Sequence, residues 1–180
     1  MSSPLRIMVA KANLATASRL AELGHQTFTE TFAAHNTPAD LASYLAETFG
    51  PELQLAQLQD PAVTFLLAEM QGQAVGYAQL VQDSPLGLPP GKKAKQLEIS
   101  KLYVAEDWVG TGLGGALMRR ILELAQAADN SALVLGVWEH NERAKAFYQR
   151  FGFREIGEHE FVLGQDVQRD LILRKGLAGR

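Results

Sequence analysis

The sequence predicts an α/β protein with a mixed central sheet of about seven strands flanked by helices. Two observations support this class. Apolar runs of strand length alternate with segments whose apolar residues recur at helical spacing, and the chain closes with two strand-like runs joined at Gly164. Strands that alternate with helices build sheets covered by helices. We expect one domain, residues 1–180, which is long enough to bury a sizeable core.

Seven runs have the length and apolar content of strands. The second and third are joined by Gln71-Gly72-Gln73 and predict a hairpin. Residues 84–95 form a loop rich in Pro, Gly and Lys before the fourth run. The predicted strands are 5–10, 62–70, 74–82, 96–104, 131–138, 153–163 and 168–174.

Five segments carry helical periodicity or helix-start signals. Thr37 can cap the second of them, with Pro38 at the first helical position, and Gly50-Pro51 ends it. Gly152 suits a left-handed cap after the last helix. The predicted helices are 14–32, 38–49, 51–58, 112–129 and 141–151.

The most informative segment is a glycine-rich turn that follows the strand at 96–104. Its glycines stand at 110, 112, 114 and 115, where the next helix begins. Glycines leave backbone N–H groups bare, and these donors together with the helix dipole favour a phosphate group. The sequence therefore predicts that this turn holds a phosphate-bearing ligand.

Three alternatives account for the turn less well. GTGLGG matches the Rossmann pattern, with Glu139 near the place of a ribose-binding acid, but residues 105–109 separate the turn from its strand and few residues follow Glu139. A P-loop requires a Lys-Ser or Lys-Thr pair after the glycines, and none is present. Close packing alone explains one or two glycines better than four in six positions.

Two signatures resemble those of the Gcn5-related N-acetyltransferases. V-G-T-G-L-G at 109–114 is similar to the family's Gln/Arg-x-x-Gly-x-Gly/Ala turn, and N-E-R-A-K-A-F-Y-Q-R-F-G-F at 141–153 to its Asn-x-x-Ala-x-x-Phe-Tyr-x-x-x-Gly-Phe helix. Val109 stands where the family usually has Gln or Arg. This departure removes a side chain that commonly helps to hold the cofactor's phosphates, while the backbone donors remain.

A wider resemblance extends over residues 25 to 175. The segments 26–49, 135–153 and 161–173 are similar to the bacterial Pai-type polyamine N-acetyltransferases, which acetylate spermidine and spermine. The resemblance implies a fold in which the strands ending at Val104 and starting at Ser131 splay apart and admit acetyl-CoA as cosubstrate. It implies acetyl transfer to a primary amine, most simply a polyamine, in a ternary complex. Peptide or protein amines, or a silent CoA-binding module, are the alternatives.

Composition excludes several other classes. The chain has no cysteine, so a disulfide framework, a thiolate metal cluster and a cysteine acyl-enzyme are all excluded. Its four histidines lack zinc-binding spacing, and we expect no metal.

Charge and hydropathy limit the partners and the location. A formal net charge of -3 argues against nucleic acid as the main partner. No apolar run approaches a membrane span and MSSPLR lacks a signal-peptide core, so we expect a cytoplasmic enzyme with no membrane partner. The oligomeric state stays open, including a homodimer.

The resemblance assigns cofactor contacts to the end of a strand, the glycine turn and the last helix. Asn141 can serve both as helix cap and as a cofactor contact. The Val104 N–H is the simplest donor to the oxyanion. Lys92, Lys93 and Lys95 either reach the cofactor's 3′-phosphate or form a solvated loop. The assigned cofactor residues are Leu102, Tyr103, Val104, Val109, Gly110, Thr111, Gly112, Leu113, Gly114, Gly115, Asn141, Lys145 and Tyr148.

Acetyl transfer from a thioester to an amine requires an uncharged amine and a proton for the leaving thiolate. A protonated alkylamine, with a pKa of about 10.4, cannot attack, so a carboxylate must take its proton. Glu98 is the candidate base, and an ordinary solvated strand residue is its alternative. Tyr148 matches the family's thiolate-protonating tyrosine, and an apolar helix stripe is its alternative.

The acceptor is expected near the first two helices and the segment that links them. A polyamine requires carboxylates spaced along a groove whose apolar walls contact its methylenes. The candidate acceptor residues are Phe28, Glu30, Phe32, His35, Tyr44 and Glu139, in addition to Glu98.

Overall fold

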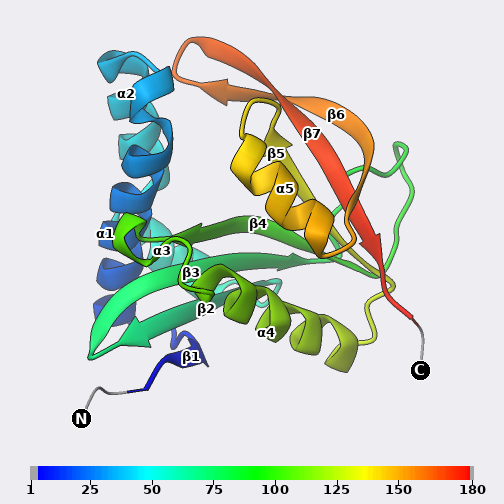
Figure 1. The fold of residues 1–180 in the computed structure, drawn as a ribbon, viewed down its shortest axis with the longest axis horizontal. Coiled ribbons are helices and arrows are strands. Elements are labelled where there is room, and N and C mark those ends of the chain that lie inside the picture. Colours follow the sequence, from blue (N-terminus) through cyan, green and yellow to red (C-terminus); the bar gives the residue numbers. More distant parts are fainter. Residues whose placement is uncertain (1–3, 179–180) are drawn as a thin grey trace.

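The computed structural model describes residues 4–178 and contains the predicted seven-stranded mixed sheet (Figure 1). The strand order is β1-β2-β3-β4-β5-β7-β6. Every neighbouring pair is antiparallel except β4 and β5, which are parallel. The strands are β1 Arg6–Val9, β2 Val63–Met70, β3 Gln73–Gln82, β4 Gln96–Val104, β5 Ala132–Trp138, β6 Arg154–Leu163 and β7 Asp166–Gly176.

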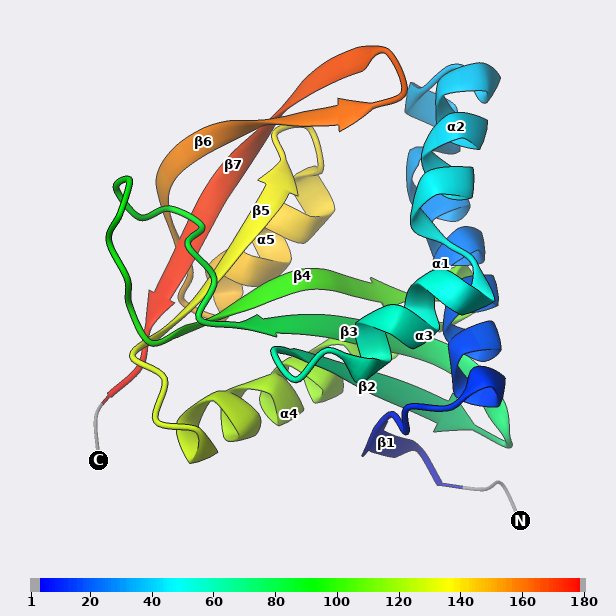
Figure 2. The same cartoon turned by 180° about the vertical axis from the view of Figure 1, so that it is seen from behind.

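The helices lie on both faces of the sheet. α4 and α5 cover one face, whereas α1 and α3 cover the other, as the opposite views in Figures 1 and 2 show. α2 stands beside the tip of the β6–β7 hairpin, where the Gln165 N–H donates to Asp40 Oδ1 at 2.9 Å. The helices are α1 Leu14–Phe32, η1 Ala33–His35, α2 Pro38–Thr48, α3 Pro51–Gln59, η2 Glu106–Trp108, α4 Leu113–Ala127 and α5 Glu142–Arg150.

Local signals place most of the helix ends. Thr37 accepts a hydrogen bond from the Asp40 N–H, and Pro38 occupies the first turn of α2 as predicted. α4 begins at Leu113 rather than 112, because Gly112 has a left-handed φ of 88° and forms the cap. β7 begins at Asp166 rather than 168, because a tight turn at Gly164, with φ 61°, pairs Leu163 directly with Asp166. The sequence therefore predicted the elements correctly, and many of their ends differ from the predicted ones by one or two residues.

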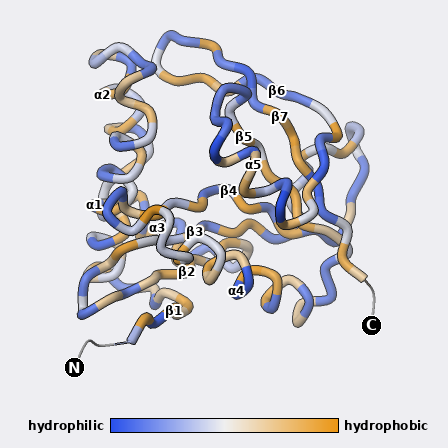
Figure 3. Tube along the Cα trace, viewed as in Figure 1, coloured by the Kyte–Doolittle hydropathy of each residue, from blue (hydrophilic) through white to orange (hydrophobic). Residues whose placement is uncertain are grey.

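The main core lies between the sheet and helices α4 and α5. Leu117, Met118 and Ile121 of α4 are completely buried and belong to one cluster with Leu133 and Leu135 of β5. Figure 3 shows hydrophobic stretches along α4 and along the strands of the sheet. The packing fixes β5 against α4, so β5 forms a rigid wall of the space beside it.

β4 and β5 separate along their length. They pair only at Gln96↔Ala132, Leu97↔Leu133 and Glu98↔Val134. The β3–β4 register shifts just beyond these pairs, where Ser100 is an extra residue on β4. Such a bulge bends and twists its strand, so β4 diverges from β5 immediately after Glu98 (Figure 2).

The bulge also reverses which residues of β4 face the α4 core. Leu97 and Ile99 pack into that core before the bulge, and Leu102 and Val104 pack against it afterwards. Glu98, Lys101 and Tyr103 therefore share the opposite face, toward α1 and α2. One inserted residue brings two charged groups and one phenol to the same side of the diverging strands.

The loop 84–95 lies at the start of β4, and the glycine turn lies beyond its end (Figure 1). A nine-residue strand spans about 30 Å. Lys92, Lys93 and Lys95 are exposed at this distant end, which favours a solvated loop over a contact with the 3′-phosphate. Among residues 4–178, no helix is both long enough and apolar enough to cross a bilayer.

Candidate active site

A cleft of about 220 Å³ opens where β4 and β5 separate. One wall is the bulged part of β4, and the other is formed by β5 and α5 with β6 and β7 beside them. The cleft brings together residues that are distant in the sequence and that were predicted for three different roles. These are Glu98, Leu102, Tyr103, Asn141 and Tyr148 for chemistry and cofactor, and Phe28, Phe32 and Tyr44 for the acceptor.

The glycine turn presents free backbone donors next to this cleft. Gly110 and Gly112 have φ of 79° and 88°, a conformation that side chains with a Cβ rarely adopt. A Cβ at either position would meet no atom within 4 Å, so close packing does not explain these two glycines. Within residues 4–178 the amides of five positions make no hydrogen bond: Gly110, Gly112, Leu113, Gly114 and Gly115. The arrangement fits a pyrophosphate at the N-terminus of α4.

The Val104 N–H points into the opening between the strands. The Ala105 N–H donates to Val75 O at 2.8 Å, and hydrogen-bond direction alternates along an antiparallel strand. The Val104 N–H therefore points away from β3, toward the side where β5 no longer pairs. It is a backbone donor free to bind a carbonyl oxygen or an oxyanion.

Tyr148 lies on α5 with its ring buried against the core and along the cleft wall. Only 8% of the residue is exposed, and its ring makes edge contacts with Phe147 and Phe153. Burial raises the pKa of the Tyr148 phenol above its ordinary value. The phenol therefore stays protonated across the neutral range and can donate a proton.

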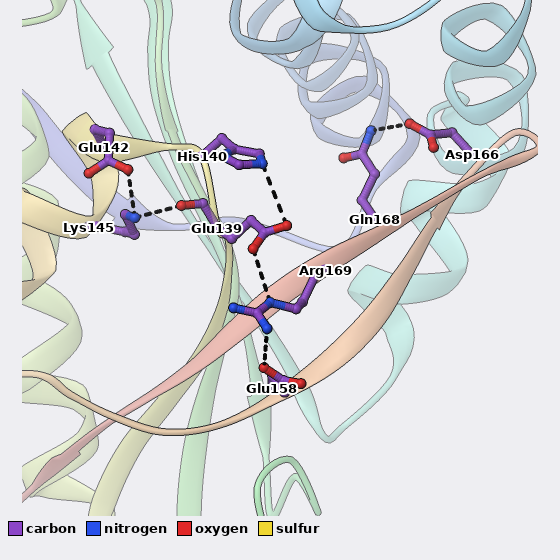
Figure 4. A network of polar contacts seen from close by, with 8 residues as sticks. All are labelled: Glu139, His140, Glu142, Lys145, Glu158, Asp166, Gln168 and Arg169. Carbon is purple, nitrogen blue, oxygen red and sulfur yellow. Dashed lines mark hydrogen bonds and ion pairs between the residues drawn. The ribbon is translucent and has the colours of Figure 1, made fainter.

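Asn141 and Lys145 organise the start of α5. Asn141 Oδ1 accepts a hydrogen bond from the Ala144 N–H at 3.2 Å, which is the cap that the sequence predicts. Lys145 Nζ donates to Glu139 O at 2.5 Å and pairs with Glu142 at 2.7 Å. Asn141 lines the cleft, whereas Lys145 is held beside it by these contacts (Figure 4).

Glu98 lies at the point where the cleft closes. Its Oε2 accepts a hydrogen bond from the Ser84 hydroxyl at 2.5 Å, so the first residue of the loop 84–95 fixes the position of the carboxylate. Lys101 is on the same face of β4, and its Nζ is 5.9 Å from the centre of the Phe49 ring. Burial lowers the pKa of Lys101, and the nearby charge of Glu98 opposes this shift.

The acceptor side of the cleft is aromatic. The Phe28 ring centre is 4.3 Å from that of Tyr44 and 4.4 Å from that of Phe32. Trp138 closes this group from β5, with its ring centre 6.1 Å from Phe32 and 5.1 Å from His35. The walls suit the methylenes of an alkylamine.

Two predicted acceptor acids lie elsewhere. Glu30 Oε2 accepts a hydrogen bond from the Glu106 N–H at 3.0 Å, so this residue ties α1 to the segment before the glycine turn. Glu139 lines an adjoining groove of about 600 Å³ and pairs with Arg169 at 3.0 Å (Figure 4). Arg169 also pairs with Glu158 at 2.8 Å. His35 lines the same groove.

A family model described as the acetyltransferase (GNAT) family matches residues 25–153. The chain belongs to this family. It is an acyltransferase of the N-acetyltransferase class, with acetyl-CoA as its cosubstrate. The glycine turn and the separated strands of this acetyltransferase fit that cosubstrate, because both offer free backbone donors.

Relatives of this acetyltransferase match most of its length. An uncharacterized N-acetyltransferase in the pepI 3′ region of Lactobacillus delbrueckii subsp. lactis is 34% identical over 86% of this chain and 88% of that protein. An uncharacterized N-acetyltransferase of Mycobacterium tuberculosis is 32% identical over 89% of this chain and 97% of that protein. The PaiA N-acetyltransferase from Thermoplasma acidophilum, solved in complex with coenzyme A, is 16% identical with a TM-score of 0.77, covering 97% of this chain and 100% of that chain.

Several cleft residues of this acetyltransferase were not predicted from the sequence, among them Trp138, His159 and Asp170. Trp138 pairs with Asp170 across β5 and β7, and Asp170 pairs with His159 across β7 and β6. Their convergence depends on the register of three strands. The available signal was Asp170 itself, a carboxylate directly before the apolar run Leu171 to Leu173.

A negative charge in the glycine turn should weaken CoA binding. Gly114→Asp should weaken CoA binding at least tenfold more than Gly114→Asn, because only the aspartate repels the pyrophosphate. Both side chains fit, since a Cβ there would lie 3.5 Å from the Phe147 ring. Calorimetric titration with CoA measures the affinities. Gly114→Asp should be at least as stable to heat as Gly114→Asn, because an acid is favourable at a helix N-terminus. Equal CoA affinities of the two variants would contradict the assignment.

Tyr148 generates a second prediction. Tyr148→Phe should lower kcat by roughly 100-fold, the size of a general-acid contribution, with little change in CoA affinity. Tyr77→Phe is the matched control, because Tyr77 is buried against α1 outside the cleft. Steady-state kinetics for both variants, with unfolding temperatures, make the comparison. Normal turnover of Tyr148→Phe would show that Tyr148 has a packing role in the core and is not the general acid.

Proposed function

We propose that this acetyltransferase transfers acetyl from acetyl-CoA to a terminal primary amine of a polyamine such as spermidine or spermine, by direct attack in a ternary complex. The observation that carries the proposal is the composition of the cleft. Glu98 and Tyr148 line it together with the carboxylate of Asp170 and with aromatic side chains that form a chamber. The Val104 N–H lies further along β4, in the part of that strand that has no β5 partner.

Each group has a separate task in the proposed reaction. Glu98 takes a proton from the acceptor ammonium through water, because Val104 lies six residues further along β4, and the Ser84 hydroxyl orients the Glu98 carboxylate. The Val104 N–H donates to the oxyanion that forms when the amine attacks the thioester carbonyl. Tyr148 protonates the departing thiolate. The chain has no cysteine, which supports direct transfer over a cysteine acyl-enzyme.

Two features support a polyamine as the acceptor. The rings of Phe28, Phe32 and Tyr44 offer apolar walls to the methylenes, and carboxylates in the cleft offer partners to the ammonium groups. The sequence resembles the Pai-type polyamine acetyltransferases over most of its length. PaiA of Thermoplasma acidophilum shares the fold at 16% identity.

A larger acceptor is the second candidate. The groove of about 600 Å³ shares Trp138, His159 and Gln168 with the cleft, so the space for an acceptor continues beyond the chamber. An amino-terminal peptide would extend into this groove.

The deciding experiment is an acceptor panel. The enzyme is incubated with acetyl-CoA and with spermidine, spermine, small monoamines or amino-terminal peptides, while free thiol is followed and acetylated products are identified by mass spectrometry. We expect the highest kcat/KM for spermidine or spermine. Preference for the peptides would replace the polyamine proposal with the second candidate. Tight CoA binding without thiol release would identify a silent CoA-binding module.

Glu98 generates a prediction about pH. Glu98→Gln should lower kcat/KM by roughly 100-fold at pH 7, and the deficit should shrink as the pH approaches about 10.4, where free amine becomes abundant. Glu52→Gln, an exposed acid on α3, is the control. The pH profiles of kcat/KM decide the matter. A constant deficit at every pH would assign Glu98 a role other than base.

A further inference from the structure

Asp170 of β7 lines the cleft with a carboxylate of which one oxygen has no hydrogen-bond partner among residues 4–178. Only 13% of its side chain is exposed. Its Oδ1 is fully buried and makes no hydrogen bond within residues 4–178, and its Oδ2 is 4.0 Å from His159 Nε2. Ionised groups are rarely buried this deeply without a partner, because desolvation disfavours the charged form. A cationic ligand would supply the missing partner.

The surroundings of Asp170 are mainly aromatic. Tyr44 from α2 and Tyr103 from β4 are close enough for the charge of Asp170 to help raise their pKa values. Trp138 is its neighbour on β5. Aromatic rings around a carboxylate add cation–π attraction for an ammonium group. His159 from β6 is its nearest basic neighbour, and Lys101 lies beside Glu98 instead.

Gly136 keeps the space next to this carboxylate clear. A Cβ at Gly136 would lie 2.8 Å from His159 Nε2 and 3.4 Å from Asp170 Oδ2. Its backbone does not adopt a left-handed φ, so conformation does not require a glycine here. A glycine is required at position 136 because a larger side chain would crowd the His159–Asp170 pair.

Asp170 lies at a distance from Glu98, the proposed base. Glu98 pairs with Val134 on β5, and Asp170 pairs with Trp138 on the same strand. Four positions along a strand correspond to about 13 Å at roughly 3.3 Å per residue. The two carboxylates therefore lie at different points along the cleft, with aromatic walls between them.

We propose that Asp170 binds a second, non-reacting ammonium group of the acceptor, so that the enzyme selects amines with two or more cationic groups over monoamines. Glu98 handles the reacting amine, Asp170 holds the distant one, and the aromatic rings contact the methylenes that link them. Gly136 and His159 shape the subsite. The inference rests on the proposed function and specifies the part of the cleft that recognises the acceptor.

The test compares Asp170→Asn with wild type on spermidine and on n-hexylamine, a monoamine. We expect kcat/KM for spermidine to fall at least tenfold, mostly through KM, while kcat/KM for n-hexylamine changes less than twofold. Gly136→Ala should act in the same direction, because it crowds the pair. Glu155→Gln, an exposed acid on β6 outside the cleft, is the matched control and should behave like wild type.

The possible results separate the subsite from the reaction. Unchanged kinetics of Asp170→Asn with spermidine, or an equal loss with both amines, would overturn the subsite while the proposed function stands. Wild-type enzyme that acetylates neither amine would overturn the proposed function itself. CoA titration of Asp170→Asn should match wild type, because the subsite lies on the acceptor side.

Thermal unfolding distinguishes a binding role from a structural one. Burial raises the pKa of Asp170 above its ordinary value of 3.8, and His159 opposes the shift. A raised carboxyl pKa means that the charged form disfavours folding once the pH exceeds the unfolded value. Asp170→Asn should therefore unfold at the same or a higher temperature than wild type at pH 7, and any gain should disappear as the pH falls toward 4. A marked loss of stability at pH 7 would make Asp170 structural and overturn the proposal.

Discussion

The separation of β4 from β5 is the constraint on which the rest of the site depends. Pairing stops at Glu98, and the extra residue Ser100 bends β4 away from its neighbour. The cost is a set of backbone groups on β4 without a β5 partner, which a sheet would ordinarily satisfy. These groups remain available to a ligand that enters between the strands. The Val104 N–H and the opposed positions of Glu98 and Tyr148 follow from this one irregularity.

Two hydrogen bonds connect the acceptor side to the rest of this framework. Glu30 of α1 accepts from the Glu106 N–H, just before the glycine turn. Asp40 of α2 accepts from the Gln165 N–H at the tip of the β6–β7 hairpin. The helices that supply the aromatic wall are thus tied to the cofactor turn at one point and to the strands that carry Asp170 at another. Both contacts fix the position of the chamber relative to β4 and β7.

Local sequence signals predicted what depends on local structure. Four glycines at a helix start and Thr37-Pro38 specify a turn and a cap through backbone geometry, so these elements could be predicted. The phosphate site at the glycine turn stays a prediction. Glu30 shows the limit of prediction from local sequence, because its position on α1 directs it to the Glu106 amide rather than into the chamber. Asp170 shows the same limit, since only the register of β5, β6 and β7 brings Asp170 opposite Trp138 and His159.

The free amides of β4 and the glycine turn support the most direct test of this account. Hydrogen exchange resolved at individual amides, measured with and without CoA, reports which backbone donors the cosubstrate occupies. The account predicts slower exchange with CoA at Val104 and across residues 110–115, with little change in α3. Saturating CoA that leaves exchange at these amides unchanged would contradict the claim that the separated strands and the turn hold the cosubstrate.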